Sequence, residues 1–380
     1  MSVTYIGDKT KILLWGKAAG RCQYDGCNQV LYQDALTKAE FNQAYIAHIV
    51  ADKPDGPRGD KVESERLKSA LSNLMLLCDT HHRLVDKEDV AGHPRERLEK
   101  MKAKHEGRME ILTSIHVDKR SHVVLYGANV GNHTSPLSMN NDVMNAMIPE
   151  RYPVDKRAVE ISLKNHADTD KTPEYWESEE RNLVSNFHKK ITPLKDDDEV
   201  KHFSMFAFAP QPLLIKLGTL FSDMYDVNIY ERQMEPEPSW KWGDVAEVDV
   251  FTFTEPSDTS GIPVLLLSLS ATVTHDRIYN VLGNNCSIWT VSIDKPQRGF
   301  VKTKQLLGKY RTHMRQVYNR IKAVHGQKSE LHVFPVMPIS LAIETGRVWM
   351  PKADMPLVIY DQNSATNFNG FQKTIIIKNQ

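Results

Sequence analysis

Three of the four cysteines form, with one histidine, the pattern that most constrains the fold of this chain. Cys22 and Cys27 make one pair with four residues between them, and Cys78 precedes His81 by three positions. Two close pairs joined by a long loop are the usual layout of a tetrahedral zinc site, and thiolate and imidazole suit this cation. The spacing therefore predicts a structural zinc bound by Cys22, Cys27, Cys78 and His81, with His82 as the alternative to His81.

The composition is that of a soluble globular protein. Hydrophobic residues make up 41% and charged residues 25% of 380 residues, which predicts two or three domains. Four cysteines are too few for a disulfide scaffold and favour a reducing, cytoplasmic setting. We expect no membrane association, because neither a long apolar run nor a secretory signal is visible. The 48 basic and 48 acidic residues cancel, so nucleic-acid binding would need a local patch.

The segment between the two pairs carries further polar residues suited to catalysis. Residues 44–50 read as a short strand that contains His48, and a loop rich in turn formers follows at residues 51–59. Asn73 then leads into the second pair, which is followed directly by His82. A single histidine on an apolar strand is usually a core residue, but here His48, Asn73, His81 and His82 all lie around one predicted zinc core.

In this order and setting, the residues resemble the HNH endonucleases of the ββα-metal fold. The resemblance covers about residues 10–112, and its signature positions are His48, Asn73 and His82. It implies that His48 is the general base that deprotonates water. It also implies that Asn73 orients the His48 loop or lies close to the metal. His82 would bind a divalent cation, magnesium, that stabilises the leaving oxyanion.

One position departs from the family pattern and leaves the catalytic metal short of a ligand. Many members carry an acidic residue or a histidine directly before the first signature histidine, where this chain has Ala47. Asp86, four residues after His82, could supply the missing oxygen from one helical turn away. Asp52 is the less favoured alternative.

A charged helix is predicted over residues 94–112. Its lysines and arginines alternate with glutamates, a pattern that usually marks a solvated face. As part of a nuclease, the helix would instead hold the phosphate backbone of DNA, which positions a duplex without reading its sequence. The predicted backbone contacts are Arg95, Lys102 and Lys104.

The remainder of the chain is predicted to be a second, larger domain. Residues 116–121 lack a periodic pattern and are predicted to link a domain of residues 1–115 to one of residues 122–380. Apolar strands alternate with helices there, which favours a parallel, Rossmann-like sheet. Strands are expected near residues 203–208, 248–253, 264–269, 288–293, 331–334 and 357–360. Helices are expected at residues 139–147, 173–190, 213–224, 276–282 and 302–324.

A faint internal repeat is present in this second domain. Residues 206–218 and 332–346 both run from a strand through a proline turn into an apolar helix that contains a glycine. This suggests two fused copies of one α/β unit, with a ligand crevice where the carboxyl ends of the strands gather. No dinucleotide-binding glycine motif, P-loop or nucleophile elbow is found, so the domain is predicted to be a sensor rather than a second enzyme.

These features resemble the SAVED domain, a fusion of two CARF-like units that binds cyclic oligonucleotides. The resemblance rests on residues 208–218, 265–270 and 333–346, together with Trp240 and Trp242. With the N-terminal module it implies an HNH–SAVED effector of bacterial CBASS antiphage signalling. Such an effector binds a cyclic di- or trinucleotide, assembles from a resting homodimer into a higher homo-oligomer such as a tetramer, and degrades double-stranded DNA non-specifically in abortive infection.

A cyclic nucleotide needs flat surfaces for its bases and donors for its phosphates. Tyr126 and Trp289 are predicted to stack on bases, although Trp289 also reads as a core residue. Arg298 and Lys304 are predicted to meet phosphates. The remaining predicted donors are Gly127, Asn129, Ser268 and Ser270. Cys286 is interpreted as a buried thiol or an incidental residue.

Two other functions remain compatible with the sequence. One is a zinc-containing nucleic-acid-binding protein with a degenerate active site, which Ala47 favours. The other is a constitutive nuclease with a protein-binding C-terminal domain. The first alternative predicts no effect of a His48→Ala substitution, and the second predicts cleavage without a small molecule.

Overall fold

The computed structural model describes residues 4–130, 137–162, 170–195, 199–243, 250–362 and 370–378. The chain divides into two compact units, Met1–His116 and Val117–Gln380, which are described separately. Among the residues described, no helix has both the length and the apolar character that crossing a bilayer requires.

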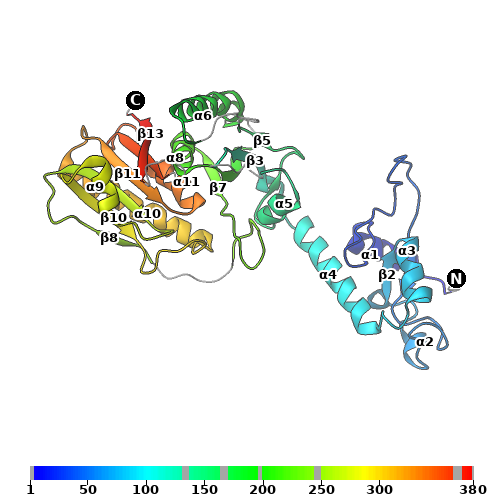
Figure 1. The fold of residues 1–380 in the computed structure, drawn as a ribbon. Coiled ribbons are helices and arrows are strands. Elements are labelled where there is room, and N and C mark those ends of the chain that lie inside the picture. Colours follow the sequence, from blue (N-terminus) through cyan, green and yellow to red (C-terminus); the bar gives the residue numbers. More distant parts are fainter. Residues whose placement is uncertain are drawn as a thin grey trace. The chain divides into compact units, whose positions relative to one another are not determined.

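Unit 1 is built from a two-stranded antiparallel sheet and short helices, drawn in blue and cyan in Figure 1. Strand β1 pairs with β2 so that His48 lies opposite Leu74. The register places the signature histidine at the last position of its strand. The elements are α1 (Asp8–Ala18), β1 (Tyr45–His48), α2 (Glu63–Leu67), η1 (Leu71–Asn73), β2 (Leu74–Leu77), α3 (Asp79–Arg83), the π-helical turn η2 (Leu84–Glu88) and α4 (Arg95–Thr113).

The core of unit 1 is small, and this explains why a metal would matter to it. All four residues of β2 are buried, and Leu14 of α1 and Leu98 of α4 pack into the same cluster. Cys22 and Cys78 belong to that cluster as well. A domain of this size buries limited apolar surface, and structural metals commonly supply the missing stability.

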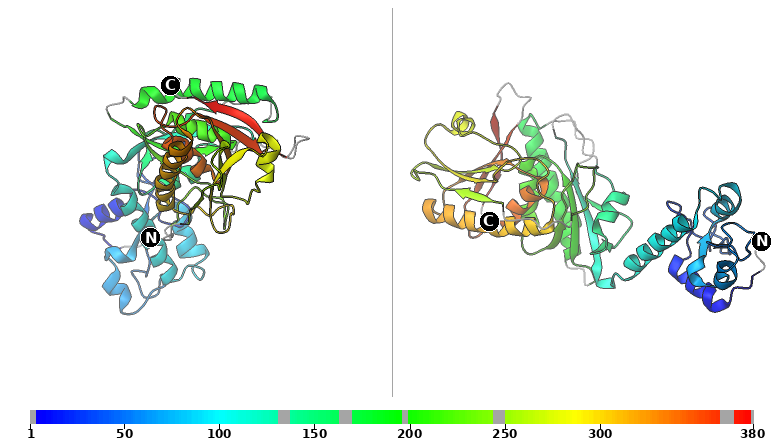
Figure 2. Two further views of the ribbon diagram at one scale, coloured as in Figure 1. Left: turned by 90° about the vertical axis from the view of Figure 1, so that its left-hand side faces the viewer. Right: turned by 90° about the horizontal axis from the view of Figure 1, so that it is seen from below.

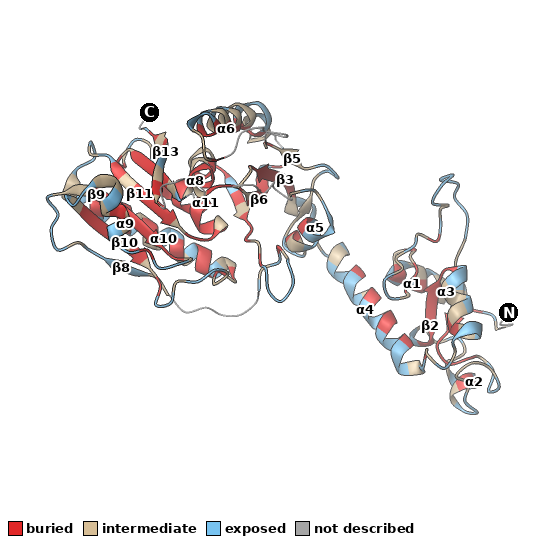
Figure 3. Ribbon diagram, viewed as in Figure 1, coloured by how far each residue is buried: buried red, intermediate tan, exposed pale blue. Residues whose placement is uncertain are grey.

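Unit 2 contains two sheets, and Figure 3 shows buried residues concentrated on their strands. The first sheet has the order β4-β3-β6-β7, with β5 also paired to β3, and all its pairings are parallel. The second has the order β13-β12-β11-β9-β10-β8. The strands are β3 (Arg120–Gly127), β4 (Tyr152–Pro153), β5 (Val159–Glu160), β6 (His202–Phe208), β7 (Asp226–Ile229), β8 (Thr252–Thr254), β9 (Ile262–Ser268), β10 (Cys286–Ser292), β11 (Leu331–Val336), β12 (Leu357–Gln362) and β13 (Phe371–Ile377).

The helices of unit 2 lie close to the positions that the apolar pattern predicts. The predicted helix at residues 276–282 coincides with α9, and the one at residues 173–190 continues in the structure through a π-helical turn, η4. The helical elements are η3 (Val117–Lys119), α5 (Asn141–Met147), α6 (Pro173–Asn186), η4 (Phe187–Ile191), α7 (Thr192–Lys195), α8 (Gln211–Leu220), α9 (Asp276–Leu282), α10 (Lys304–His325) and α11 (Ile339–Val348).

The structure corrects three sequence predictions about the fold of unit 2. The second sheet is mixed, because the edge strands β8 and β13 run antiparallel to their neighbours. The predicted linker of residues 116–121 is too long, because Arg120 and Ser121 already belong to β3. The side chain of Ser121 is buried and forms hydrogen bonds with Ser204 and His202. The strand predicted at residues 248–253 is β8 at Thr252–Thr254, and residues 248 and 249 of that prediction lie outside the described residues.

The internal repeat places α8 and α11 against each other at the centre of unit 2. Each helix follows a parallel strand, β6 or β11, and Figure 2 shows α11 in orange beside the green elements of the first half. Their crossing is so close that a Cβ on Gly218 would lie 2.0 Å from the carbonyl oxygen of Ile343, and one on Gly346 would lie 2.0 Å from that of Ile215. The two glycines of the repeat are therefore where the backbones of the two halves meet.

Aromatic pairs repeat in the same way on both sheets. Phe206 of β6 stacks on Tyr230 with ring centroids 4.3 Å apart, and Phe334 of β11 stacks on Tyr360 at the same separation. The interplanar angles are 11° and 8°. Buried stacked pairs of this kind contribute about 1 kcal/mol beyond their burial. Equivalent packing in both halves supports the interpretation of two copies of one α/β unit.

Candidate metal centre and ligand-binding region

The predicted zinc ligands meet at one point of unit 1. One donor atom from each of Cys22, Cys27, Cys78 and His81 lies within 4.8 Å of every other. The Nδ1 atom of His81 is 3.1 Å from the sulfur of Cys78 and 3.8 Å from that of Cys22. Tetrahedral zinc with Zn–S bonds of about 2.3 Å holds its ligand atoms at comparable separations. The four residues could bind zinc, and His81 rather than His82 completes the set.

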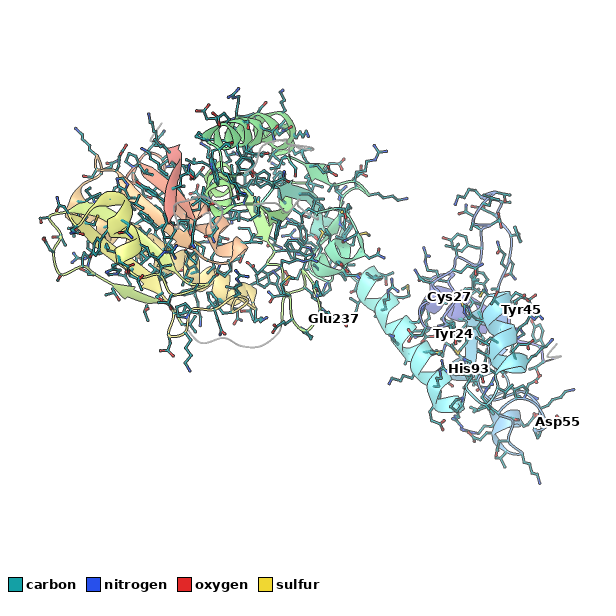
Figure 4. The ribbon with its side chains drawn as sticks, in the orientation of Figure 1. Tyr24, Cys27, Tyr45, Asp55, His93 and Glu237 are labelled. Carbon is teal, nitrogen blue, oxygen red and sulfur yellow. The ribbon has the colours of Figure 1, made fainter. Side chains whose placement is uncertain are left out.

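The surroundings of the cluster favour the metal-binding form of His81 but oppose that of Cys22. Burial lowers the pKa of His81, which keeps the ring neutral, and its ring stacks on Tyr24 at 4.1 Å. Tyr24 in turn contacts His93 through a 3.0 Å hydrogen bond; Figure 4 labels both together with Cys27. Burial raises the pKa of the Cys22 thiol, so its thiolate form requires a compensating cation.

We expect one zinc per chain, and loss of the metal should unfold unit 1 alone. A Cys27→Ser substitution should abolish zinc binding and remove the unfolding transition of unit 1, because the small core of unit 1 would lose the metal that stabilises it. Metal analysis and differential scanning calorimetry measure this. Cys286→Ser, in unit 2, is the matched control and should keep the full zinc content. Retention of zinc by Cys27→Ser would exclude this site.

His48 lies at the end of β1 with one ring nitrogen already engaged. Its Nε2 atom is 2.8 Å from the carbonyl oxygen of Lys68. A carbonyl can only accept, so Nε2 carries the proton and Nδ1 carries the free lone pair of the neutral ring. The residue is 8% exposed. This arrangement fixes the tautomer and ring orientation that a general base requires.

Asn73 holds the chain that follows His48. Its side-chain oxygen accepts a hydrogen bond from the amide of Val50, and its side-chain nitrogen donates to the carbonyl oxygen of Val50; both distances are 2.8 Å. A further bond reaches the carbonyl oxygen of Leu67. Of the two roles that the resemblance implies for Asn73, this geometry fits the orientation of the His48 loop.

His82 and Asp86 form a pair one helical turn apart. The Nε2 atom of His82 lies 3.4 Å from Oδ2 of Asp86, and the His82 ring stacks on Tyr45 at 4.8 Å. Burial lowers the pKa of His82, partly opposed by the charge of Asp86, and the neutral ring is the form that binds metals. Asp52, the alternative ligand, instead accepts a 2.6 Å hydrogen bond from Thr4.

The three predicted DNA contacts on α4 differ in their accessibility. Lys104 is exposed and pairs with Asp25, and Arg95 is partly exposed and pairs with Glu99. Lys102 is buried and paired with Glu106, so the prediction that it contacts DNA is corrected. The error arises because charged side chains on a helix alternate between faces, and Lys102 falls on the face that packs against the core.

The two aromatic residues predicted to stack on bases are core residues in the structure. Tyr126 and Trp289 are both fully buried. Trp289 donates from Nε1 to His325 and stacks on Phe253. Rings that the protein covers completely cannot receive a base, so these two predictions are corrected. Apolar strands carry aromatic residues into the core more often than to a rim.

The other predicted ligand contacts lie at or beyond the carboxyl ends of strands. Gly127 ends β3 and donates its amide to the hydroxyl of Ser162, and the carbonyl oxygen of Asn129 accepts the Tyr175 hydroxyl. Ser268 ends β9, where its hydroxyl closes a turn to Ala271, and the amide of Ser270 bonds to β11. Arg298 is exposed, and Lys304 is paired with Glu150.

Glu179 and Glu231 are two of several buried carboxyl groups in unit 2 that sequence reasoning missed. Glu179 of α6 is fully buried, and neither of its oxygens has a hydrogen-bond partner within the described part of the chain. Glu231 follows β7 and accepts a 2.7 Å bond from the amide of Ser340 at the start of α11. Burial raises the pKa of each to about 7. No sequence pattern marks either residue, because only the fold removes it from water.

The contribution of Glu231 to the stability of unit 2 should fall as the pH rises through 7. The pKa of Glu231 is raised to about 7, so the folded state binds this proton more tightly than the unfolded chain does. The stabilisation is fully present below about pH 4.5, and about 3 kcal/mol of it is lost by pH 8 and above. Thermal unfolding at pH 5.5 and 8.5 should detect about 2 kcal/mol of this loss.

Glu231→Gln keeps an acceptor for Ser340 and should remove the share of the pH dependence that Glu231 contributes, while the share of Glu179 remains. Glu237→Gln, an exposed carboxyl on the same loop and labelled in Figure 4, is the matched control and should leave the wild-type profile. An unchanged profile in Glu231→Gln would contradict the assignment.

Comparisons with known proteins describe the C-terminal part of the chain. A family model described as the SMODS-associated and fused to various effectors sensor domain (SAVED) matches residues 183–377, just over half of the chain. No curated protein matches the chain significantly.

Solved structures of Cap4 SAVED/CARF-domain containing receptors are similar to the chain. One from Acinetobacter baumannii, with the cyclic trinucleotide 2'3'3'-cAAA, is 13% identical with a TM-score of 0.44; 83% of this chain and 61% of that chain are covered. The same receptor with 3'3'3'-cAAA gives 12% and 0.42, covering 79% and 66%. The receptor from Moraxella osloensis gives 10% and 0.38, covering 75% and 59%. The chain thus spans about three fifths of the length of these structures.

Proposed function

Because the chain belongs to the SAVED family of sensor domains that are fused to effectors, we propose that it is a ligand-gated effector nuclease. Its effector is the HNH-like unit 1, and its sensor is unit 2. Binding of a cyclic di- or trinucleotide to the sensor would activate metal-dependent cleavage of double-stranded DNA in antiphage defence. The nuclease proposal is carried by one observation: His48 is held as a single tautomer beside a loop that Asn73 fixes.

The chemistry follows from what these side chains can do. His48, with Nδ1 unprotonated, would take a proton from the attacking water, and its bond to Lys68 would support the imidazolium that forms. Asn73 would keep this ring in place through its two bonds to Val50. Magnesium held by His82 and Asp86 would supply Lewis-acid stabilisation of the leaving oxygen.

Substrate binding would use the phosphate backbone. Arg95 and Lys104 are accessible on α4, although each is paired with an acidic side chain. On binding, these two side chains would leave their acidic partners and contact DNA phosphates, which releases counterions from the DNA. Such phosphate contacts do not depend on the base sequence. We therefore propose non-specific cleavage with strong dependence on salt concentration.

The sensor would act by a shift of populations. A ligand activates only if it binds the active assembly more tightly than the resting one. We propose that the ligand binds at the carboxyl ends of the parallel strands, where Gly127 and Ser268 end β3 and β9. One HNH site cuts one strand, so double-strand cleavage implies that at least two protomers act together, from a resting dimer to an active higher oligomer.

A plasmid-cleavage assay tests the proposal. The full chain is incubated with Mg²⁺ and supercoiled plasmid, alone and with each member of a panel of cyclic di- and trinucleotides. We expect cleavage with one ligand and none without it. Cleavage in every reaction would leave a constitutive nuclease and remove the gate. Binding of a ligand in calorimetry without cleavage at any protein concentration would retain the sensor and exclude the nuclease.

A further inference from the structure

Arg58 connects the two halves of the proposed nuclease site. It lies in the loop between β1 and α2, with its backbone in the left-handed region at φ 56°. Its side chain is only 8% exposed. A buried guanidinium needs acceptors for its donors, and a non-glycine residue in this backbone region persists only where the surroundings hold it.

Four hydrogen bonds from its three nitrogens hold the guanidinium of Arg58. Two reach the end of β1: Nε donates to the carbonyl oxygen of Ile49 at 2.7 Å, and Nη2 donates to that of His48 at 3.3 Å. The other two reach the π-helical turn η2: Nη1 donates to the carbonyl oxygen of Val85 at 2.9 Å, and Nη2 donates to Oδ1 of Asp86 at 2.6 Å. The guanidinium of Arg58 therefore connects the strand that carries His48 to the turn that carries Asp86.

The hydrogen bond from Arg58 determines which carboxylate oxygen of Asp86 faces His82. Since Oδ1 is held by Arg58, Oδ2 faces Nε2 of His82 at 3.4 Å. Two ligand atoms at adjacent positions of an octahedral Mg²⁺, each at about 2.1 Å, are about 3 Å apart. The pair is therefore close to the spacing of two neighbouring ligands, and Arg58 sets the orientation of one of them.

We propose that Arg58 is a positioning residue that orients Asp86 toward the cation beside His82 and ties this turn to the strand that carries His48. This inference rests on the proposed function of unit 1. It gives the loop of residues 51–59 a role. The loop supplies the guanidinium that orients Asp86, and Asp86 would replace the ligand that this chain lacks at Ala47. Groups that orient metal ligands typically change metal affinity about 10–100-fold when they are removed.

Two other roles for Arg58 make opposite predictions. A phosphate contact would need free, accessible donors, whereas this side chain is buried and bonded to protein acceptors. A competitor for Asp86 would exclude the cation by its own charge, so loss of Arg58 would then strengthen metal binding. The direction of the change in metal affinity therefore separates orientation from competition.

The test measures Mn²⁺ affinity of the zinc-loaded full chain by electron paramagnetic resonance and calorimetry, without DNA. We expect the Mn²⁺ site to be lost in His82→Ala and weakened about 10-fold or more in both Arg58→Gln and Arg58→Lys. Lysine keeps the charge and loses the fork, so it should not rescue binding. Arg66→Gln, which removes an exposed arginine paired with Glu63, should bind as wild type does.

A double-mutant cycle tests whether Arg58 affects metal binding through Asp86. In an Asp86→Asn background, Arg58→Lys should cause no further loss of affinity, because the oriented carboxylate is already gone. Zinc content near one per chain in every variant shows that unit 1 stays folded. Unchanged or tighter Mn²⁺ binding in Arg58→Gln would overturn the inference. Absence of a His82-dependent Mn²⁺ site in the wild type would instead overturn the proposed nuclease site itself.

Discussion

Replacement of His48 by alanine is expected to reduce ligand-stimulated DNA cleavage by about 10³-fold, within the range of about 10²–10⁴ that a general base contributes. Nδ1 of His48 is the base in our proposal, and Nε2 of the same ring donates to the carbonyl oxygen of Lys68. DNA binding and zinc content should remain, because the Cys₃His cluster and the accessible side chains of α4 are formed by other residues. Single-turnover cleavage of a labelled duplex measures the rate.

Two comparisons make this experiment specific for catalysis. His116→Ala, which removes an exposed histidine from the same unit, should cleave at the wild-type rate. Added imidazole should restore part of the activity of His48→Ala, because the variant leaves a space where the ring was. Activity of His48→Ala within about threefold of wild type would contradict the general-base role and favour a nucleic-acid-binding function.

Gly346→Ala is expected to destabilise unit 2 by about 3 kcal/mol, at the upper end of the cost of overpacking a core. The added methyl group would lie 2.0 Å from the carbonyl oxygen of Ile215. This oxygen belongs to the backbone of α8, so it cannot rotate away as the end of a side chain could. The two helices would have to separate, and the packing between the halves of the sensor would loosen. Urea unfolding of the full chain, followed by tryptophan fluorescence, measures the change.

The control substitution, Gly308→Ala, is expected to change the stability in the opposite direction. Gly308 lies within α10, and none of the described atoms that could obstruct an added methyl group lies within 4 Å of it. Gly308→Ala should therefore stabilise the domain by up to about 1 kcal/mol through helix propensity. Gly218→Ala should behave like Gly346→Ala, because its methyl group would meet Ile343 equally closely. Equal stability of Gly346→Ala and Gly308→Ala would show that α8 and α11 do not pack this closely.

Local patterns in the sequence predicted the elements that depend on short spacings. The Cys₃His cluster follows from two pairs of residues on tight turns, and the structure brings His81 to the three cysteines. The helix at Asp276–Leu282 and the strands around β6, β9, β10, β11 and β12 follow from apolar periodicity. The repeated glycines Gly218 and Gly346 indicated two similar halves, which the structure places helix against helix.

Other features depend on how distant segments pack, which no local spacing records. Strand β13 has apolar residues as other strands do, yet nothing in them shows that it pairs with β12 in the antiparallel direction. Tyr126, Trp289 and Lys102 were predicted to be accessible and are buried, because burial is a property of the neighbours that cover a side chain. The sequence predicted the strand or helix that carries each residue, but not whether its side chain points into the core or toward solvent.

The sequence by itself predicted the zinc cluster up to the choice between His81 and His82, many of the strands and helices of unit 2, and His48, Asn73 and His82 as the residues on which the nuclease proposal rests. Only the tertiary structure decided how those residues are held. Arg58 is close to Asp86 although 28 positions separate them, and Glu231 reaches Ser340 across 109 positions. A short motif specifies side chains that one turn or one strand positions, whereas the pKa of a buried carboxyl group and the orientation of a ligand depend on contacts that exist only once the chain has folded.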